Sequence, residues 1–195
     1  MIDFFFDFET RSRLDLKKVG SMKYSLDPST ETTLITWCFG RGEIKAWRTG
    51  QAIPPELLTV AENPEKYNFV AHNLLFDYLI WMKVFIKNIP TIKPIPMANL
   101  TDNMAIAHYN RMGSSLEQCA DMNGLGVSKD KAGRVIMLKQ CKPATTGKGK
   151  GNFPVLTEEE WKQFTYYGII DGQRLTRQLY EELRSGRVPD TNHHS

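Results

Sequence analysis

The order of strand-like and helix-like segments limits the fold of this chain more than any other feature. An aromatic-rich segment at residues 2–8 has the composition of a strand. Residues 34–39 and 43–47 flank a Gly-Arg-Gly turn, and this arrangement predicts a β-hairpin. The short apolar segment 67–71 then leads into a helical pattern over 74–85, with Asn73 as a plausible N-cap. The first half of the chain therefore predicts strands followed by a strand–helix unit.

The second half is mainly helical. A strand is expected near residues 97–101, and helices are expected at 104–109, 115–121, 130–140, 157–167 and 171–183. Thr157 followed by Glu160 forms the capping box that marks the start of the fourth of these helices. This order predicts an α/β fold in which helices flank a mixed central β-sheet.

Length and hydropathy indicate one globular domain. The 195 residues suit a single core, which we expect over residues 1–187, followed by a polar tail at 188–195. No apolar run reaches the roughly 18 residues of a membrane span, and the N-terminus lacks the basic leader of a signal peptide. A cytoplasmic location is therefore expected, in the host cytoplasm if the protein is phage-encoded.

Positive charge is concentrated in one stretch, although the net charge of the chain is only +3. Residues 129–150 contain seven Lys or Arg and a single acid, so this stretch is +6 and the remainder is −3. A basic patch beside an acidic pocket fits an enzyme that holds a phosphate backbone and cuts it with metals. A solvated loop without a partner is the alternative interpretation. Within this stretch, KPATTGKGKG at 142–151 predicts a mobile loop.

Two acids on the first predicted strand are the first candidate site residues. Because side chains alternate along a strand, Asp7 and Glu9 point to one face while Phe8 points into the core. Two adjacent carboxylates repel each other, and a half-buried pair usually needs a cation. An Asp-x-Glu motif alone is weak support, since it is common by chance.

Two later acids extend the set. Asp77 lies one turn into the helix that follows residues 67–71, so its carboxylate faces the strand end and can share a cation with Asp7. Tyr167 and Asp171 are four residues apart and share a face of an α-helix. In isolation, each has an ordinary alternative: Asp77 a solvated acid on an amphipathic helix, and Tyr167 a core aromatic beside a surface acid.

Together, the three motifs resemble those of the DEDD exonuclease superfamily, in particular its tyrosine subgroup. Asp7 and Glu9 match its D-x-E motif, Asn73, Phe76 and Asp77 match its second motif, and Tyr167 and Asp171 match Y-x3-D. The segments DFETRS (7–12), LDLKKVG (14–20), SLEQ (115–118) and KDKAGRVIMLKQCKP (129–143) are similar to the proofreading domain of phage-type family A DNA polymerases. Gly172-Gln173 departs from the pattern, because relatives more often carry an apolar residue and an acid there.

This resemblance implies a ribonuclease H-like fold and a 3′→5′ exonuclease that hydrolyses DNA and releases nucleoside 5′-monophosphates. It also implies two divalent cations, Mg²⁺ or Mn²⁺, roughly 4 Å apart at the four carboxylates. In this scheme Asp7 bridges both ions, Glu9 and Asp171 complete the site of the metal that activates water, and Asp77 supports the other. Tyr167 orients the attacking water.

Further residues are candidates for substrate binding: Thr10, His72, Asn73, Phe76, Lys129, Lys131 and Arg134. His72 and Phe76 have core positions as alternatives, and Asn73 has helix capping. Asp102 is interpreted as a helix cap or a residue behind the ligands, not as a metal ligand.

The expected partner is a single-stranded DNA 3′ end, and RNA is the first alternative substrate. Only 24 residues follow Asp171, too few for a polymerase module, so we expect a free-standing exonuclease, a cut-out domain or a proofreading subunit with a separate DNA polymerase. A module that binds strand ends without cutting is the alternative from another functional class. Retention of four acids argues against it, because a pure binder gains nothing from negative charge beside phosphate.

Overall fold

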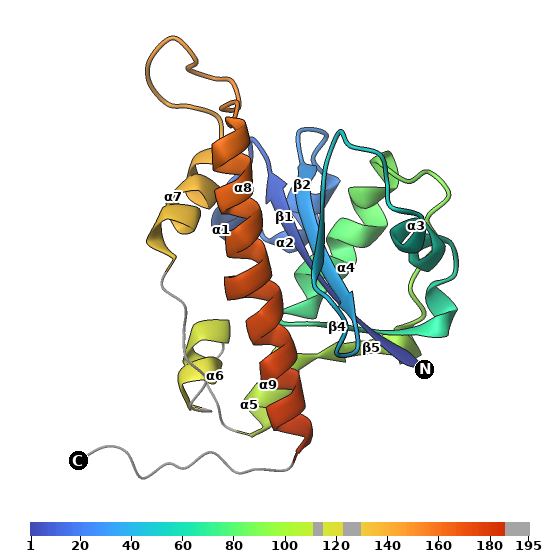
Figure 1. Ribbon diagram of the computed structural model, residues 1–195. Helices are drawn as coiled ribbons and strands as arrows, with labels where there is room; N and C mark the ends of the chain where they lie inside the picture. The colour runs from blue at the N-terminus through green and yellow to red at the C-terminus, as the bar shows by residue number, and fades with distance from the viewer. Residues whose placement is uncertain (111–114, 123–129, 186–195) are drawn as a thin grey trace, which may run out of the picture.

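A mixed five-stranded sheet forms the centre of the molecule (Figure 1). The computed structural model describes residues 1–110, 115–122 and 130–185. In order across the sheet the strands are β3 (Lys45–Arg48), β2 (Glu31–Phe39), β1 (Ile2–Arg11), β4 (Tyr67–Ala71) and β5 (Leu100–Asp102). The first three strands pair antiparallel, whereas β1, β4 and β5 run parallel. The predicted α/β fold of the ribonuclease H-like type, with helices flanking a mixed sheet, is confirmed.

Strand β1 has apolar side chains on both faces because it lies between β2 and β4. Phe4, Phe6 and Phe8 enter the main core, and the rings of Phe4 and Phe6 pack edge-on against Trp81. Phe5 points the other way and packs against Tyr180. Burial of several aromatic rings in one strand contributes on the order of 1.5–3 kcal/mol for each ring, so β1 is fixed firmly within the sheet.

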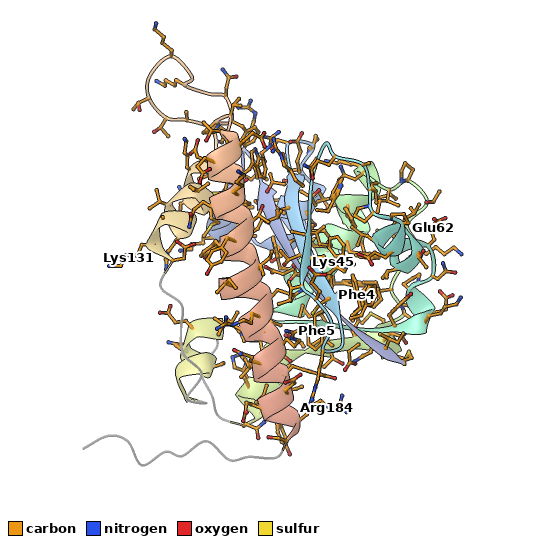
Figure 2. All side chains as sticks on the ribbon, in the orientation of Figure 1. Phe4, Phe5, Lys45, Glu62, Lys131 and Arg184 are labelled. Carbon is orange, nitrogen blue, oxygen red and sulfur yellow. The ribbon has the colours of Figure 1, made fainter. Side chains whose placement is uncertain are left out.

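Helices cover both faces of the sheet. The main core is covered by α3 (Pro55–Glu62) and α4 (Leu74–Lys83), and the Phe5 face is crossed by a long helical rod (Figures 1 and 2). The rod consists of α8 (Glu158–Tyr167), η4 (Gly168–Arg174) and α9 (Leu175–Arg184). The remaining helices are α1 (Leu16–Val19), α2 (Ser21–Leu26), η1 (Pro64–Lys66), η2 (Phe85–Lys87), η3 (Met97–Asn99), α5 (Asn103–Tyr109), α6 (Leu116–Met122) and α7 (Lys131–Gln140). Among the helices of the described residues, none has the length and apolar character that a membrane span requires.

Most predicted elements are present, with shifted ends. The strand at 67–71 and the capping box of Thr157 and Glu160 are confirmed. The helix predicted over 74–85 ends at Lys83, and a 3-10 turn follows it. The strand predicted near 97–101 lies at 100–102, behind another 3-10 turn. The single domain over 1–187 stays a prediction, and the tail at 188–195 lies outside the described residues.

The prediction of two separate helices at 157–167 and 171–183 is wrong. The chain stays helical from Glu158 to Arg184, and residues Gly168–Arg174 form a π-helical turn between two α-helices. Because a π-turn bonds residue i to i+5, the α-helical spacing used to place Tyr167 and Asp171 on one face does not hold there. Single π-turns in long helices occur frequently at functional sites.

Candidate active site

Asp7 and Glu9 lie on the face of β1 that the helical rod covers. Both side chains are half-buried, and Phe8 between them is buried in the opposite core, as the alternation predicted. The rod comes closest at Gly172: a Cβ built on this residue would lie 3.0 Å from Oδ2 of Asp7. The first and third sequence motifs, more than 150 residues apart, therefore meet at one point.

Asp77 joins this site from the edge of β1. The pairing of β1 with β4 stops at Phe5, so none of the described strands pairs with β1 on that side beyond this residue. The carboxylate of Asp77, in the first turn of α4, accepts a hydrogen bond of 2.9 Å from the Phe8 N–H there. The side chain of Asp77 is only 2% exposed. This bond fixes the start of α4 against β1 beside the Asp7 and Glu9 pair.

Burial and mutual repulsion favour protonation of these acids. Removal from water raises the pKa of Asp7 to about 7. Burial and the neighbouring Asp7 charge together raise the pKa of Glu9 to about 8. The pKa of Asp77 is also raised, first by burial and then by the Asp7 charge, although the Phe8 N–H opposes this. A cation beside these groups would remove the penalty for ionising them.

The first prediction concerns the pH dependence of stability without metal. The pKa values of Asp7 and Glu9 are higher in the folded chain than the unfolded values near 4. Their stabilising contribution is therefore complete below about pH 4 and is lost as the pH rises through 7 and 8. In EDTA, we expect the free energy of unfolding to fall by on the order of 2 kcal/mol between pH 5 and pH 8.5, which lowers Tm by about 6 °C. Thermal unfolding by circular dichroism measures this change, and an equal loss in Asp7→Asn would contradict its assignment to these acids.

A hydrogen bond joins the π-turn to β2 at the residue paired with Asp7. The buried Gln173 side chain donates a hydrogen bond of 3.0 Å to the carbonyl of Thr36, which is the partner of Asp7 in the β1–β2 pairing. Thr176 donates from its hydroxyl to the Gly172 carbonyl at 2.9 Å, and Asn103 of α5 donates to the Thr176 carbonyl. These bonds hold the backbone of the turn, and a glycine at 172 leaves room for the Asp7 carboxylate.

The backbone of the third motif, from Tyr167 to residue 171, lies at the end of α8 and in the π-turn. Residue 171 lies in the π-turn directly before Gly172, and its side chain is outside the described part of the structure. Tyr167, the last residue of α8, is half-buried against α7, where a Cβ on Gly133 would come within 2.5 Å of the Tyr167 Cβ. The carboxylate of Asp130 holds this contact, because it accepts from the Gly133 N–H and from the Gln163 side chain.

The donor chemistry of this site fits a hard divalent cation. Asp7, Glu9 and Asp77 supply carboxylate oxygens, the ligands that Mg²⁺ and Mn²⁺ prefer. Among the ion pairs of the described residues, none includes these three acids, so no described Lys, Arg or His lies within ion-pair distance of them. The described side chains do not by themselves form a group of three His, Cys, Asp or Glu ligands around one point. The fourth predicted ligand is Asp171, and its side chain lies outside the described part of the structure.

The predicted substrate residues near these acids have different environments. Thr10 is buried, and its hydroxyl is 2.7 Å from the Tyr24 hydroxyl. Phe76 is half-buried and packs against Tyr24, and His72 is half-buried. Asn73 occupies the N-cap position of α4 but has φ 61°, and its side chain makes no capping bond. Asn73 therefore does not cap the helix through its side chain, and its predicted contact with the substrate stays a prediction.

The predicted basic contacts lie on and before α7. Lys131 and Arg134 are exposed, and Lys131 points away from the sheet at the periphery of the molecule (Figure 2). Lys129 lies outside the described residues. Lys139 pairs with Glu160 of α8 at 2.8 Å. Asp102 accepts from the Met104 N–H as the N-cap of α5, which confirms the capping prediction.

The sequence interpretation missed Gly133 and noted Gly172 and Gln173 only as a departure from the motif. In the structure, these residues bring the helices close to Tyr167 and Asp7. The signal available in the sequence was a glycine inside a helical pattern. Because such a glycine lowers helix stability by about 1 kcal/mol, its presence suggests that close packing requires it.

Solved structures define the class of fold. The sequence matches no protein-family model and no curated protein. The fold is similar to that of solved nucleases at 13–14% sequence identity, a level at which the likeness establishes the fold alone. One is described as the apo form of the nuclease, with a TM-score of 0.51 and 14% identity over 94% of this chain and 72% of the other. Another is Brucella melitensis NrnC bound to pGG, with a TM-score of 0.52, 14% identity and the same coverage.

Proposed function

We propose that this chain is a metal-dependent 3′→5′ exonuclease of the tyrosine subgroup of the DEDD superfamily, acting on DNA. The observation that carries the proposal is the 3.0 Å approach of the Gly172 position to the Asp7 carboxylate. It places the Y-x3-D segment against the D-x-E strand, while Asp77 is bonded to the same strand at Phe8. These contacts support the proposal that the three sequence motifs form one site.

In the proposed reaction, Asp7, Glu9, Asp77 and Asp171 hold two divalent cations, Mg²⁺ or Mn²⁺. When bound, such ions activate water and stabilise the departing 3′-oxyanion. Asp7 and Glu9 are half-buried on the same face of β1, so both carboxylates would hold the cations from the same side. Tyr167 orients the attacking water through its hydroxyl, and the exposed Asn73 contacts the terminal nucleotide.

The neighbouring structures support a nucleic-acid substrate. They are nucleases with the same fold, and one of them was solved with pGG bound. The polymerase-like segments of the sequence favour DNA, with activity either alone or as a proofreading subunit beside a DNA polymerase. Exonuclease action on RNA 3′ ends is the competing form of the same chemistry, since the described residues do not determine how a 2′-hydroxyl is treated.

A gel assay on 5′-labelled single-stranded DNA and RNA tests this proposal. With Mg²⁺ or Mn²⁺, we expect a ladder of DNA products that shortens from the 3′ end, and no products in EDTA. A stronger ladder on RNA would transfer the proposal to RNA processing. Binding of strand ends without any ladder would contradict the exonuclease and favour the binding module.

The second prediction isolates the role of Tyr167. Tyr167→Phe should lower kcat by about 10- to 100-fold, because the phenol that orients the water is lost while the ring keeps its packing against Gly133. The affinity for DNA, measured by anisotropy with Ca²⁺, should stay unchanged. Tyr166→Phe, one residue earlier and exposed, is the matched control. Weaker binding by Tyr167→Phe at an unchanged kcat would instead assign Tyr167 to substrate contact.

A further inference from the structure

A basic pocket of about 420 Å³ lies just beyond the C-terminal end of β1. One side is formed by Arg13, Leu14 and Asp15, and the other by the base of the loop at 142–151. This loop projects beyond the end of the sheet at which β1 ends (Figure 1). None of the substrate residues predicted from the sequence lines this pocket.

Hydrogen bonds join the two ends of the loop at 142–151, whose composition predicted a mobile loop. Ala144 and Gly151 are joined by a hydrogen bond of 2.8 Å, and the Ala144 N–H donates to the Asn152 carbonyl at 2.9 Å. Arg13 donates from Nη1 to the Gly151 carbonyl at 2.8 Å. The guanidinium of Arg13 also lies 5.6 Å from the Phe153 ring centroid. The pocket walls are therefore connected to each other through Arg13.

Positive charge exceeds negative charge in this pocket. Its lining carries three cations, Arg13, Lys142 and Lys150, against the single acid Asp15. Lys142 lies 3.4 Å from Asp15 and offsets that charge. Lys150 takes part in none of the ion pairs found among the described residues, and its side chain is exposed. An excess of cations in a concave surface attracts a phosphate group.

The pocket adjoins the end of β1, the strand that carries Asp7 and Glu9. Gln140 donates to the Thr10 carbonyl at 3.2 Å, and the Ser12 N–H donates to the Cys141 carbonyl at 3.1 Å, so the start of the loop is attached to the end of β1. Arg13 follows Glu9 by four residues, so the two are separated by at most roughly 13 Å along the chain. This limit corresponds to about four nucleotides at the roughly 3.4 Å rise of a stacked strand.

We propose that this pocket binds a phosphate of the substrate strand a few nucleotides upstream of the cleaved 3′ end, through Arg13, Lys142 and Lys150. The inference rests on the proposed function and names a contact that the exonuclease site lacks. The phosphate is a backbone phosphodiester in a long strand. In a short oligonucleotide it would be the 5′-terminal phosphate, which has the same chemistry.

Salt-dependent binding of the full chain tests the pocket. Unlabelled strands compete with a labelled single-stranded DNA of about 20 nucleotides in Ca²⁺, for the wild type, Lys150→Gln and Lys142→Gln/Lys150→Gln. We expect the affinity to fall about threefold in Lys150→Gln and about tenfold in the double variant. The slope of log Kd against log salt should decrease by about 0.7 for each lost contact. Lys66→Gln is the matched control, because Lys66 is exposed and precedes β4 at the opposite end of the sheet. It should bind as the wild type does.

Competitor length and 5′-phosphorylation identify the source of the phosphate. A loss on long strands that is independent of the 5′ end supports a backbone phosphate, and a loss confined to short 5′-phosphorylated strands supports a terminal one. Phosphate binding by the pocket would be refuted by unchanged salt slopes in both lysine variants, or by an equal decrease of the slope in Lys66→Gln. Normal cleavage with unchanged slopes would contradict phosphate binding by the pocket and leave the proposed exonuclease intact. Decreased slopes without any cleavage would contradict the exonuclease and still support phosphate binding by the pocket.

Discussion

Replacement of Asp7 by asparagine is expected to lower kcat by about a thousandfold or more. Asp7 is the carboxylate to which the other parts of the site converge: Glu9 shares its strand face, its charge raises the pKa of Asp77, and Gly172 approaches its Oδ2. Loss of this charge removes one of the carboxylates that would hold the cations in the proposed mechanism. Single-turnover cleavage in saturating Mn²⁺ measures the effect without a contribution from product release.

A stability measurement separates this loss from misfolding. Because the ionised Asp7 is unfavourable in the absence of metal, Asp7→Asn should have a higher Tm than the wild type in EDTA at pH 8. Asp3→Asn is the matched control on the same strand, since Asp3 is bonded to Asn68 and Tyr180 far from the site. A variant that still cuts at the wild-type rate would refute the site, and a lower Tm would mean that Asp7 is structural.

Local patterns in the sequence were sufficient for the strands and for the two acids of β1. The alternation of Asp7, Phe8 and Glu9 depends only on strand geometry, and the structure buries Phe8 as expected. The missed helices α1 and α3 were also marked locally. Asp15 caps α1, and α3 begins with a proline at its first position. These signals were available, but α1 is only four residues long and has no apolar period of its own.

Contacts between distant segments could not be predicted in the same way. The bond from the Phe8 N–H to Asp77 exists because β1 continues past its pairing with β4, and this depends on the length of both strands in the sheet. The π-turn depends on tertiary bonds such as that from Gln173 to the Thr36 carbonyl. Propensity therefore predicts two helices separated near Gly168, whereas packing against β2 produces one continuous rod.

The substitution Gly172→Ala should lower the cleavage rate by about a hundredfold while the fold stays intact. The added methyl group would stand 3.0 Å from Oδ2 of Asp7, and it otherwise meets only the Asp7 carboxyl carbon, at 3.9 Å. A short carboxylate side chain relieves such a contact by rotation, so the clash moves the proposed metal ligand and not the backbone. A displacement of about 1 Å at a reacting centre can cost about a hundredfold in rate. Alanine also has a helix propensity about 1 kcal/mol better than glycine, so Tm should not decrease.

Gly168→Ala makes the same change in the same π-turn and is the matched control. Its methyl group would meet Leu34 Cδ2 at 3.2 Å and Thr36 Cγ2 at 3.4 Å, which are apolar methyl groups, and no described carboxylate oxygen lies within 4 Å of it. It should therefore keep most of the activity, whereas Gly172→Ala should also need a higher Mn²⁺ concentration for half-maximal cleavage. Equal losses in both variants would point to general disturbance of the rod. Full activity in Gly172→Ala would mean that the position of the Asp7 carboxylate is not critical, and this would contradict its place at the centre of the site.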